Sequence, residues 1–104
     1  MPTHEKVAAA ADAIETEMKR IGAWDVPAPT AERMKFKAGF GSDTMAFEQW
    51  LKHVFLPRVR DLVRSRGEFP TTSMVGTQAI REFDGRDEAA DLVSLLCEFD
   101  ALFR

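Results

Sequence analysis

Apolar side chains recur every three or four residues in three long stretches of this chain, the spacing that places them on one face of an α-helix. The first lies between Thr3, a plausible N-cap, and Gly22. The second runs to about Arg66, and the third follows the turn at Asp84-Gly85. A weaker stretch over residues 75–83 indicates a short helix, and no stretch has the alternating pattern of a strand. We therefore predict an all-α fold, a small bundle of three long helices and one short helix, in a single domain over residues 1–104.

The second of these stretches carries its own start, stop and interruption signals. Asp43 or Thr44 is expected to cap its start, and Gly67 to end it. Pro57 lies in the middle and has no main-chain N–H for the carbonyl group of His53. The middle helix is therefore expected to kink or split at Pro57.

A long connection over residues 23–42 separates the first two helices. Its prolines, Pro27 and Pro29, remove main-chain donors and favour extended geometry. A loop of this length in so small a domain is usually functional or packed by its own side chains. The apolar side chains available for that packing are Trp24, Met34, Phe36 and Phe40.

Composition and charge narrow the class of protein. The 104 residues are 45% apolar and 30% charged, which is typical of a globular domain rather than a disordered chain. A single cysteine excludes an intramolecular disulfide and fits a reducing compartment. No signal-peptide pattern or membrane-spanning apolar run is present, so we expect a cytoplasmic protein without a membrane partner.

Arg58 is the most informative polar residue of the second stretch. At about 100° per residue it lies near the middle of the apolar arc of its helix. A buried guanidinium needs a carboxylate or carbonyl partner, and Asp61 and Asp43 are the candidates. Alternatively, a kink at Pro57 turns Arg58 toward solvent. The sequence leaves both alternatives open.

Basic residues crowd the second half of the same helix. Arg60 and Arg64, perhaps joined by Lys52, could form a strip that binds RNA phosphates or an acidic protein. The alternative is a solvated helix end whose cations complement the helix dipole. Because the formal net charge is −3, we favour the second interpretation.

The chain contains no recognisable catalytic, metal-binding or cofactor-binding motif. His4 and His53 lie on different segments, and no group of His, Cys, Asp and Glu has the spacing of a zinc site. Cys97 is expected to be a buried structural residue. The last helix has a second apolar flank at Leu95 and Leu102, which indicates either a central position in the bundle or contact with a second copy of the chain. We therefore expect no enzyme, no metal and no cofactor.

Several short motifs resemble the YqcC-like family of small bacterial proteins. They are Asp43-Thr44-Met45, Glu48-x-Trp50-Leu51, Phe55-Leu56-Pro57-Arg58 and the ending Asp100-Ala101-Leu102-Phe103. The resemblance covers nearly the whole chain and implies an all-helical, bundle-like fold without an established activity. It also implies a partner, because such proteins are often encoded beside a tRNA pseudouridine synthase and sometimes carry its name.

These observations lead to one principal hypothesis and two alternatives. The principal one is a non-catalytic accessory or protein-interaction module, with a tRNA pseudouridine synthase as a candidate partner. Its expected surface comprises Trp24, Phe36, Phe40, Asp43, Trp50 and Arg58. The alternatives are an RNA-associated helper of that enzyme, acting through Lys52, Arg60 and Arg64, and a domain that binds a small ligand between its helices.

Overall fold

Helices joined by loops make up the fold of this protein in a computed structural model, which describes residues 2–103. Within that range there is no β-strand, so the predicted all-α class is confirmed. The α-helices are α1 (His4–Arg20), α2 (Phe47–Trp50), α3 (Leu56–Ser65), α4 (Val75–Glu82) and α5 (Ala90–Ala101). A π-helical turn over Leu51–Phe55 joins α2 to α3, and 3₁₀ turns lie at Gly39–Gly41 and Asp87–Ala89.

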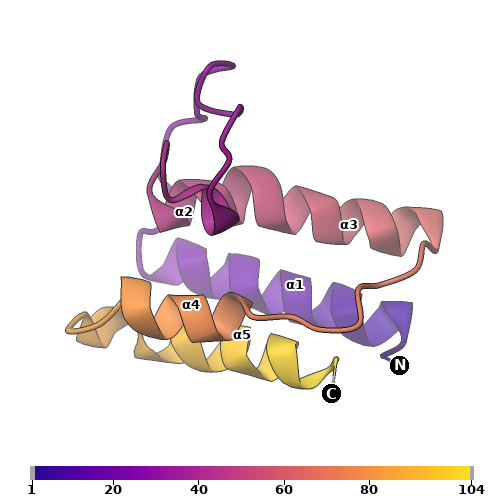
Figure 1. Ribbon diagram of the computed structural model, residues 1–104. Coiled ribbons are helices and arrows are strands. Elements are labelled where there is room, and N and C mark those ends of the chain that lie inside the picture. Colours follow the sequence, from indigo (N-terminus) through magenta and orange to yellow (C-terminus); the bar gives the residue numbers. More distant parts are fainter. Residues whose placement is uncertain (1, 104) are drawn as a thin grey trace.

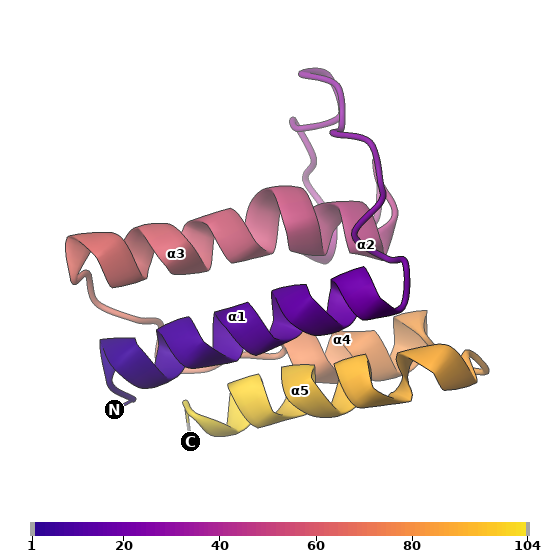
Figure 2. The ribbon, with the colours of Figure 1, turned by 180° about the vertical axis from the view of Figure 1, so that it is seen from behind.

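The helices form layers, with α1 between the other elements (Figure 1). Helix α1 packs against α3 on one side and against α5 on the other, and α4 packs against α5. The view from behind shows the same order, with α2 and α3 on one side of α1 and α4 and α5 on the other (Figure 2). The predicted grouping into three long helices and one short helix is not confirmed in that form.

Helix α1 begins and ends where the sequence predicts. The Thr3 hydroxyl accepts a hydrogen bond from the main-chain N–H of Lys6 at 3.1 Å, which satisfies one of the free donors of the first turn. Gly22 follows the last turn with a φ of 79°, in the left-handed region that favours glycine.

The region before Pro57 differs from the expected kinked helix. The predicted kink or split at Pro57 is not confirmed. Instead the Leu56 N–H donates to the Leu51 carbonyl group, five residues earlier, and α3 continues through Pro57. A π-helical turn inserts one extra residue into the helix, so every later side chain takes a different angular position from that of an uninterrupted α-helix.

The start of α2 also differs from the prediction. The helix begins at Phe47, and the Gln49 side chain accepts a hydrogen bond from the Ala46 N–H at 3.1 Å. Asp43 and Thr44 are therefore not its caps. Both hydroxyl and carboxylate are used inside the loop, whose conformation brings main-chain groups closer to them than the helix end.

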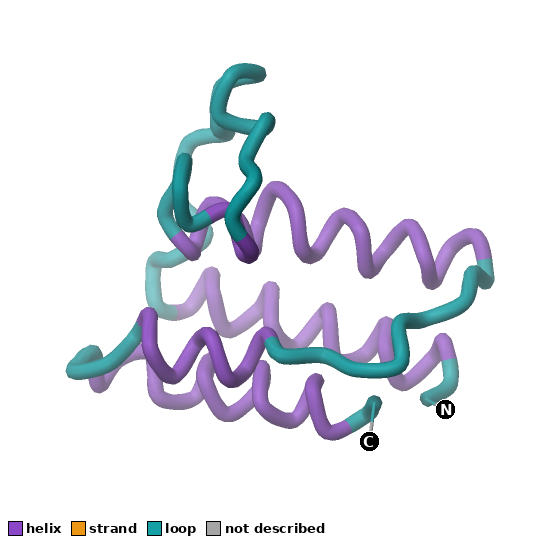
Figure 3. The backbone as a smooth tube through the Cα atoms, viewed as in Figure 1, coloured by secondary structure: helices purple, strands orange, loops and turns teal. Residues whose placement is uncertain are grey.

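The loop between α1 and α2 projects from the helical body (Figure 3). Asp43 accepts a hydrogen bond from the Lys37 N–H at 3.0 Å, and this bond is the main reason that the pKa of Asp43 is lowered. The Thr44 hydroxyl donates to the Arg33 carbonyl group at 2.7 Å, and the Arg33 guanidinium donates to the Thr44 carbonyl group at 2.6 Å. The loop is thus closed on itself by polar contacts. Met34, expected to pack inside it, is 43% exposed.

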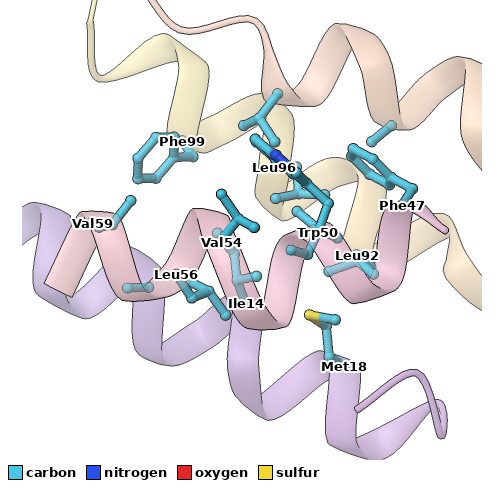
Figure 4. Packing of buried hydrophobic residues seen from close by; sticks show 14 of the residues in the cluster. Ile14, Met18, Phe47, Trp50, Val54, Leu56, Val59, Leu92, Leu96 and Phe99 are labelled. Carbon is cyan, nitrogen blue, oxygen red and sulfur yellow. The ribbon is translucent and has the colours of Figure 1, made fainter. Parts of the chain in front are cut away.

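One hydrophobic core joins the helices (Figure 4). The predicted apolar faces of α1, of the α2–α3 region and of α5 all contribute to it. Labelled members are Ile14, Met18, Phe47, Trp50, Val54, Leu56, Val59, Leu92, Leu96 and Phe99. The helical stripes of the sequence therefore face one another.

Helices α4 and α5 are fastened by a buried carboxylate. Asp100 of α5 accepts hydrogen bonds from the N–H groups of Val75 and Gly76, at 3.0 and 2.8 Å, and from the Ser73 hydroxyl at 2.6 Å. It thereby caps the start of α4, which has no cap from its own chain segment. Gly76 permits this approach, because a Cβ atom there would lie 2.6 Å from the Cα atom of Cys97.

Candidate interaction surface

Arg58 lies at the surface, so the buried alternative is wrong. Its guanidinium carbon is 5.9 Å from the centre of the Phe36 ring, in the arrangement of a cation–π contact. Among residues 2–103 no carboxylate pairs with Arg58; Asp61 pairs with Arg64, and Asp43 binds the main chain of the loop. The π-helical turn explains the outward position, because it rotates α3 relative to the arc used for the prediction.

Trp50 and Phe40 form an aromatic cluster beneath this region. Trp50 is only 8% exposed and stacks on Phe47 and Phe55, with ring centres 5.9 and 5.5 Å apart. Phe40 meets Trp50 edge-on at 5.1 Å. Its φ of 61° is unusual for a residue other than glycine. The two predicted aromatic anchors therefore support the loop from the core side, and the Trp50 Nε1 atom is buried without a hydrogen-bond partner.

Trp24 belongs to a different part of the surface. The Lys52 ammonium lies 4.8 Å from the centre of its ring and donates to the Trp24 carbonyl group at 2.8 Å. Trp24 and Lys52 line a groove together with Arg60 and Arg64. The structure thus groups Trp24 with the predicted basic strip and Phe36 with Arg58.

The basic strip is paired with acidic residues of the same chain. The Arg60 guanidinium bonds to Asp12 and Glu15 of α1, at 2.8 and 2.7 Å, and Arg64 pairs with Asp61. The pKa of Arg60 is raised, chiefly by the hydrogen bond to Asp12. The pKa of Glu15 is lowered, chiefly by a hydrogen bond from Lys19 and also by Arg60. Much of the positive charge of the strip is therefore offset locally.

An open cavity of about 220 Å³ lies beside Arg58. It is formed by α3, the segment after it and the end of α5, with Val7 of α1 contributing. Its lining residues are Val7, Trp50, Phe55, Arg58, Val59, Leu62, Phe69, Pro70, Thr72, Ser73, Phe99 and Phe103. Aromatic rings meet along it, with centres 5.1 Å apart for Phe55 and Phe99 and also for Phe99 and Phe103.

Sequence reasoning missed this cavity because its walls come from segments far apart in the chain. Phe69 and Phe103, which form one side, are 5.9 Å apart between ring centres. The only sequence signal was the presence of aromatic residues near both predicted helix ends. Few polar groups reach the cavity: Arg58, Thr72 and Ser73, of which the Ser73 hydroxyl is bound to Asp100.

The second flank of α5 forms a separate groove. Leu95 and Leu102 are half-buried and line it with Ala9, Ala10 and Ala13 of α1. The small alanine side chains leave this groove open. It is the place at which the sequence suggested contact with a second copy.

The two histidines bind main-chain groups. His4 Nε2 is 2.9 Å from the Gly67 carbonyl oxygen, and His53 Nε2 is 3.5 Å from that of Val26. In the part of the chain that the structure describes, no three His, Cys, Asp or Glu residues are close enough together to hold a metal ion. Nor does any helix there have the length and apolar character needed to cross a membrane.

Comparisons with known proteins place this arrangement in a family. The DUF446 family model, described as tRNA pseudouridine synthase C, matches residues 6–102. An uncharacterised protein of Haemophilus influenzae is 30% identical over 74 residues, which cover 68% of this chain and 70% of that protein. No solved structure matches the chain. The comparisons support membership in a small uncharacterised family but do not confirm the name YqcC-like.

Proposed function

Because the chain belongs to the DUF446 family, we propose that it is a non-catalytic accessory domain that binds another protein in the cytoplasm. The family description names tRNA pseudouridine synthase C, and we propose this enzyme as the protein partner. The helices act in this proposal as a rigid bundle that presents a binding surface.

The position of Arg58 is the observation that carries the proposal. Its exposed guanidinium lies over Phe36 and at the mouth of an apolar cavity. Arginine and aromatic side chains around a hollow are typical of the residues that contribute most to protein–protein binding. Of the predicted surface, Phe36 and Arg58 form the outer part, whereas Phe40 and Trp50 hold the loop in place from below.

Co-purification tests this function directly. The tagged chain is expressed with the tRNA pseudouridine synthase C of the same organism, and the amount of enzyme recovered is measured. We expect recovery of the enzyme with the wild-type chain and a loss of about tenfold with Arg58→Glu, because charge reversal places repulsion at the centre of the contact.

A matched variant separates this effect from a general change in charge. Arg81 is exposed on α4 and has no ion pair among the described residues, so Arg81→Glu changes the net charge equally. We expect it to leave recovery unchanged. Equal recovery with Arg58→Glu and Arg81→Glu would contradict the proposed surface, and no recovery with the wild-type chain would contradict the proposed partner.

The RNA-associated alternative receives less support from the geometry. Its three residues, Lys52, Arg60 and Arg64, bind a carbonyl group or carboxylates of the same chain. An RNA phosphate would have to displace these contacts. The third alternative, a small ligand between helices, shares the cavity beside Arg58 and is separated experimentally below.

A further inference from the structure

We infer that the cavity beside Arg58 receives one aromatic or large aliphatic side chain from an acidic, extended segment of the partner protein, and that Arg58 pairs with a carboxylate next to that side chain. The inference rests on the proposed function, since it names the chemistry of the partner. It makes no assumption about which protein carries the segment.

The size and lining of the cavity fit a single apolar side chain. Its volume of about 220 Å³ exceeds the roughly 150 Å³ of an engineered protein cavity that binds benzene. Phe55, Phe99 and Phe103 present ring surfaces to the space. A phenylalanine or leucine side chain entering it would exchange water for aromatic contacts, which is the usual basis of an anchor residue.

The charge around the opening favours an acidic partner. Arg58 has no carboxylate partner among residues 2–103, and the loop that supplies Phe36 adds Arg33, Lys35 and Lys37. Asp43 offsets part of this charge through its contact with the Lys37 main chain. The contrast with Arg60, which is held by two carboxylates, indicates that the cations near the cavity are available to another molecule.

The rim of the cavity also offers main-chain groups. Residues 70–73 follow the opening, and none of their main-chain N–H or C=O groups forms a hydrogen bond with another described residue. Thr71 and Thr72 are exposed. An extended chain can bind such free groups along the edge, as peptides do when they add to an unpaired strand.

The same cavity is less suited to a small metabolite. Sites for small molecules usually combine apolar walls with several fixed polar groups that orient the ligand. Here Arg58 and Thr72 are exposed at the rim, and the Ser73 hydroxyl is already bound to Asp100. The interior would therefore bury an apolar group without orienting a polar one.

A titration followed by NMR tests the inference with defined peptides. The probe is the acetylated, amidated pentapeptide Ser-Glu-Phe-Glu-Ser. One control replaces both glutamates by glutamine, and the other replaces phenylalanine by alanine. We expect the acidic phenylalanine peptide to shift the amide signals of Leu62, Thr72 and Phe103, with a Kd at least about fivefold below that of either control.

Two variants assign the contributions. Arg58→Gln is expected to abolish the preference for glutamate over glutamine while the preference for phenylalanine over alanine remains. Leu62→Trp is expected to fill the cavity and to remove binding of all three peptides. Preserved signal dispersion shows that each variant is folded.

Three results would overturn the inference. They are the absence of shifts at about 10 mM peptide, equal binding of the three peptides, and binding of 3-phenylpropanoate more tightly than the acidic peptide, which would identify a small-molecule site. Because the peptides are independent of the enzyme, the inference can fail while the enzyme still co-purifies through another surface. Conversely, peptide binding without co-purification would leave the cavity chemistry intact and reject the proposed partner.

Discussion

Gly76 and Asp100 show how single residues determine the contact between α4 and α5. Asp100 replaces the missing N-terminal cap of α4 from a neighbouring helix, and Gly76 lets the main chains of the two helices come close. Neither role could be predicted from the sequence, because both depend on a contact between residues 24 or 25 positions apart. A glycine inside a helix is locally unfavourable, and only the tertiary contact explains it here.

The substitution Gly76→Ala is therefore expected to destabilise the protein by about 2 kcal/mol, although alanine is the better helix former. The added Cβ atom would lie 2.6 and 2.7 Å from main-chain atoms of Cys97, which cannot move without shifting α5. Urea unfolding measures the change. The control is Gly39→Ala, where a Cβ atom meets nothing within 4 Å. Equal stability of the two variants would show that α4 and α5 do not approach as described.

At the scale of the elements, the sequence predicts what depends on local spacing and misses what depends on tertiary contacts. The stripes on α1 and α5 follow an uninterrupted α-helical period, so their buried faces could be read from the sequence. The position of Arg58 could not, because the π-helical turn at Leu51–Phe55 changes the period just before it. The caps expected at Asp43 and Thr44 failed because those side chains bind loop groups instead.

The link between α1 and α3 leads to a prediction about acid stability. Glu15 has a lowered pKa in the folded protein, chiefly because Lys19 bonds to it and also because of Arg60. A group with a lowered folded pKa contributes its full stabilisation above its ordinary value of 4.5 and loses it as the pH falls through the folded pKa. Glu15→Gln should therefore cost about 1 kcal/mol at neutral pH and progressively less as the pH falls below 4.5.

Urea unfolding at several values between about pH 7 and pH 3 measures this difference. The control is Glu68→Gln, because Glu68 is exposed and has no ion pair among the described residues. Its curve is expected to run parallel to that of the wild-type protein. A constant gap between wild type and Glu15→Gln across the acid range would mean that the contacts of this carboxylate do not stabilise the fold.

At the scale of the whole molecule, the arrangement of charges matters more than their number. The net charge of −3 alone disfavours RNA as a partner, but a local strip could still bind it. The structure pairs Arg60 and Arg64 with acidic residues and leaves Arg58 unpaired beside an apolar cavity. The surface available to a partner therefore combines one exposed cation with aromatic groups, which suits a protein segment better than a phosphate backbone.

This distribution predicts that the wild-type chain binds tRNA only weakly, with a Kd above about 100 µM even at low salt. Asp12→Asn combined with Glu15→Gln removes the two partners of Arg60 and is expected to strengthen binding, because a guanidinium becomes available to phosphates. Filter binding at two salt concentrations measures both. If the wild-type chain instead binds tRNA in the micromolar range with a steep salt dependence, and Arg60→Glu with Arg64→Glu abolishes that binding, the paired strip opens for RNA and the RNA-associated function replaces the one proposed here.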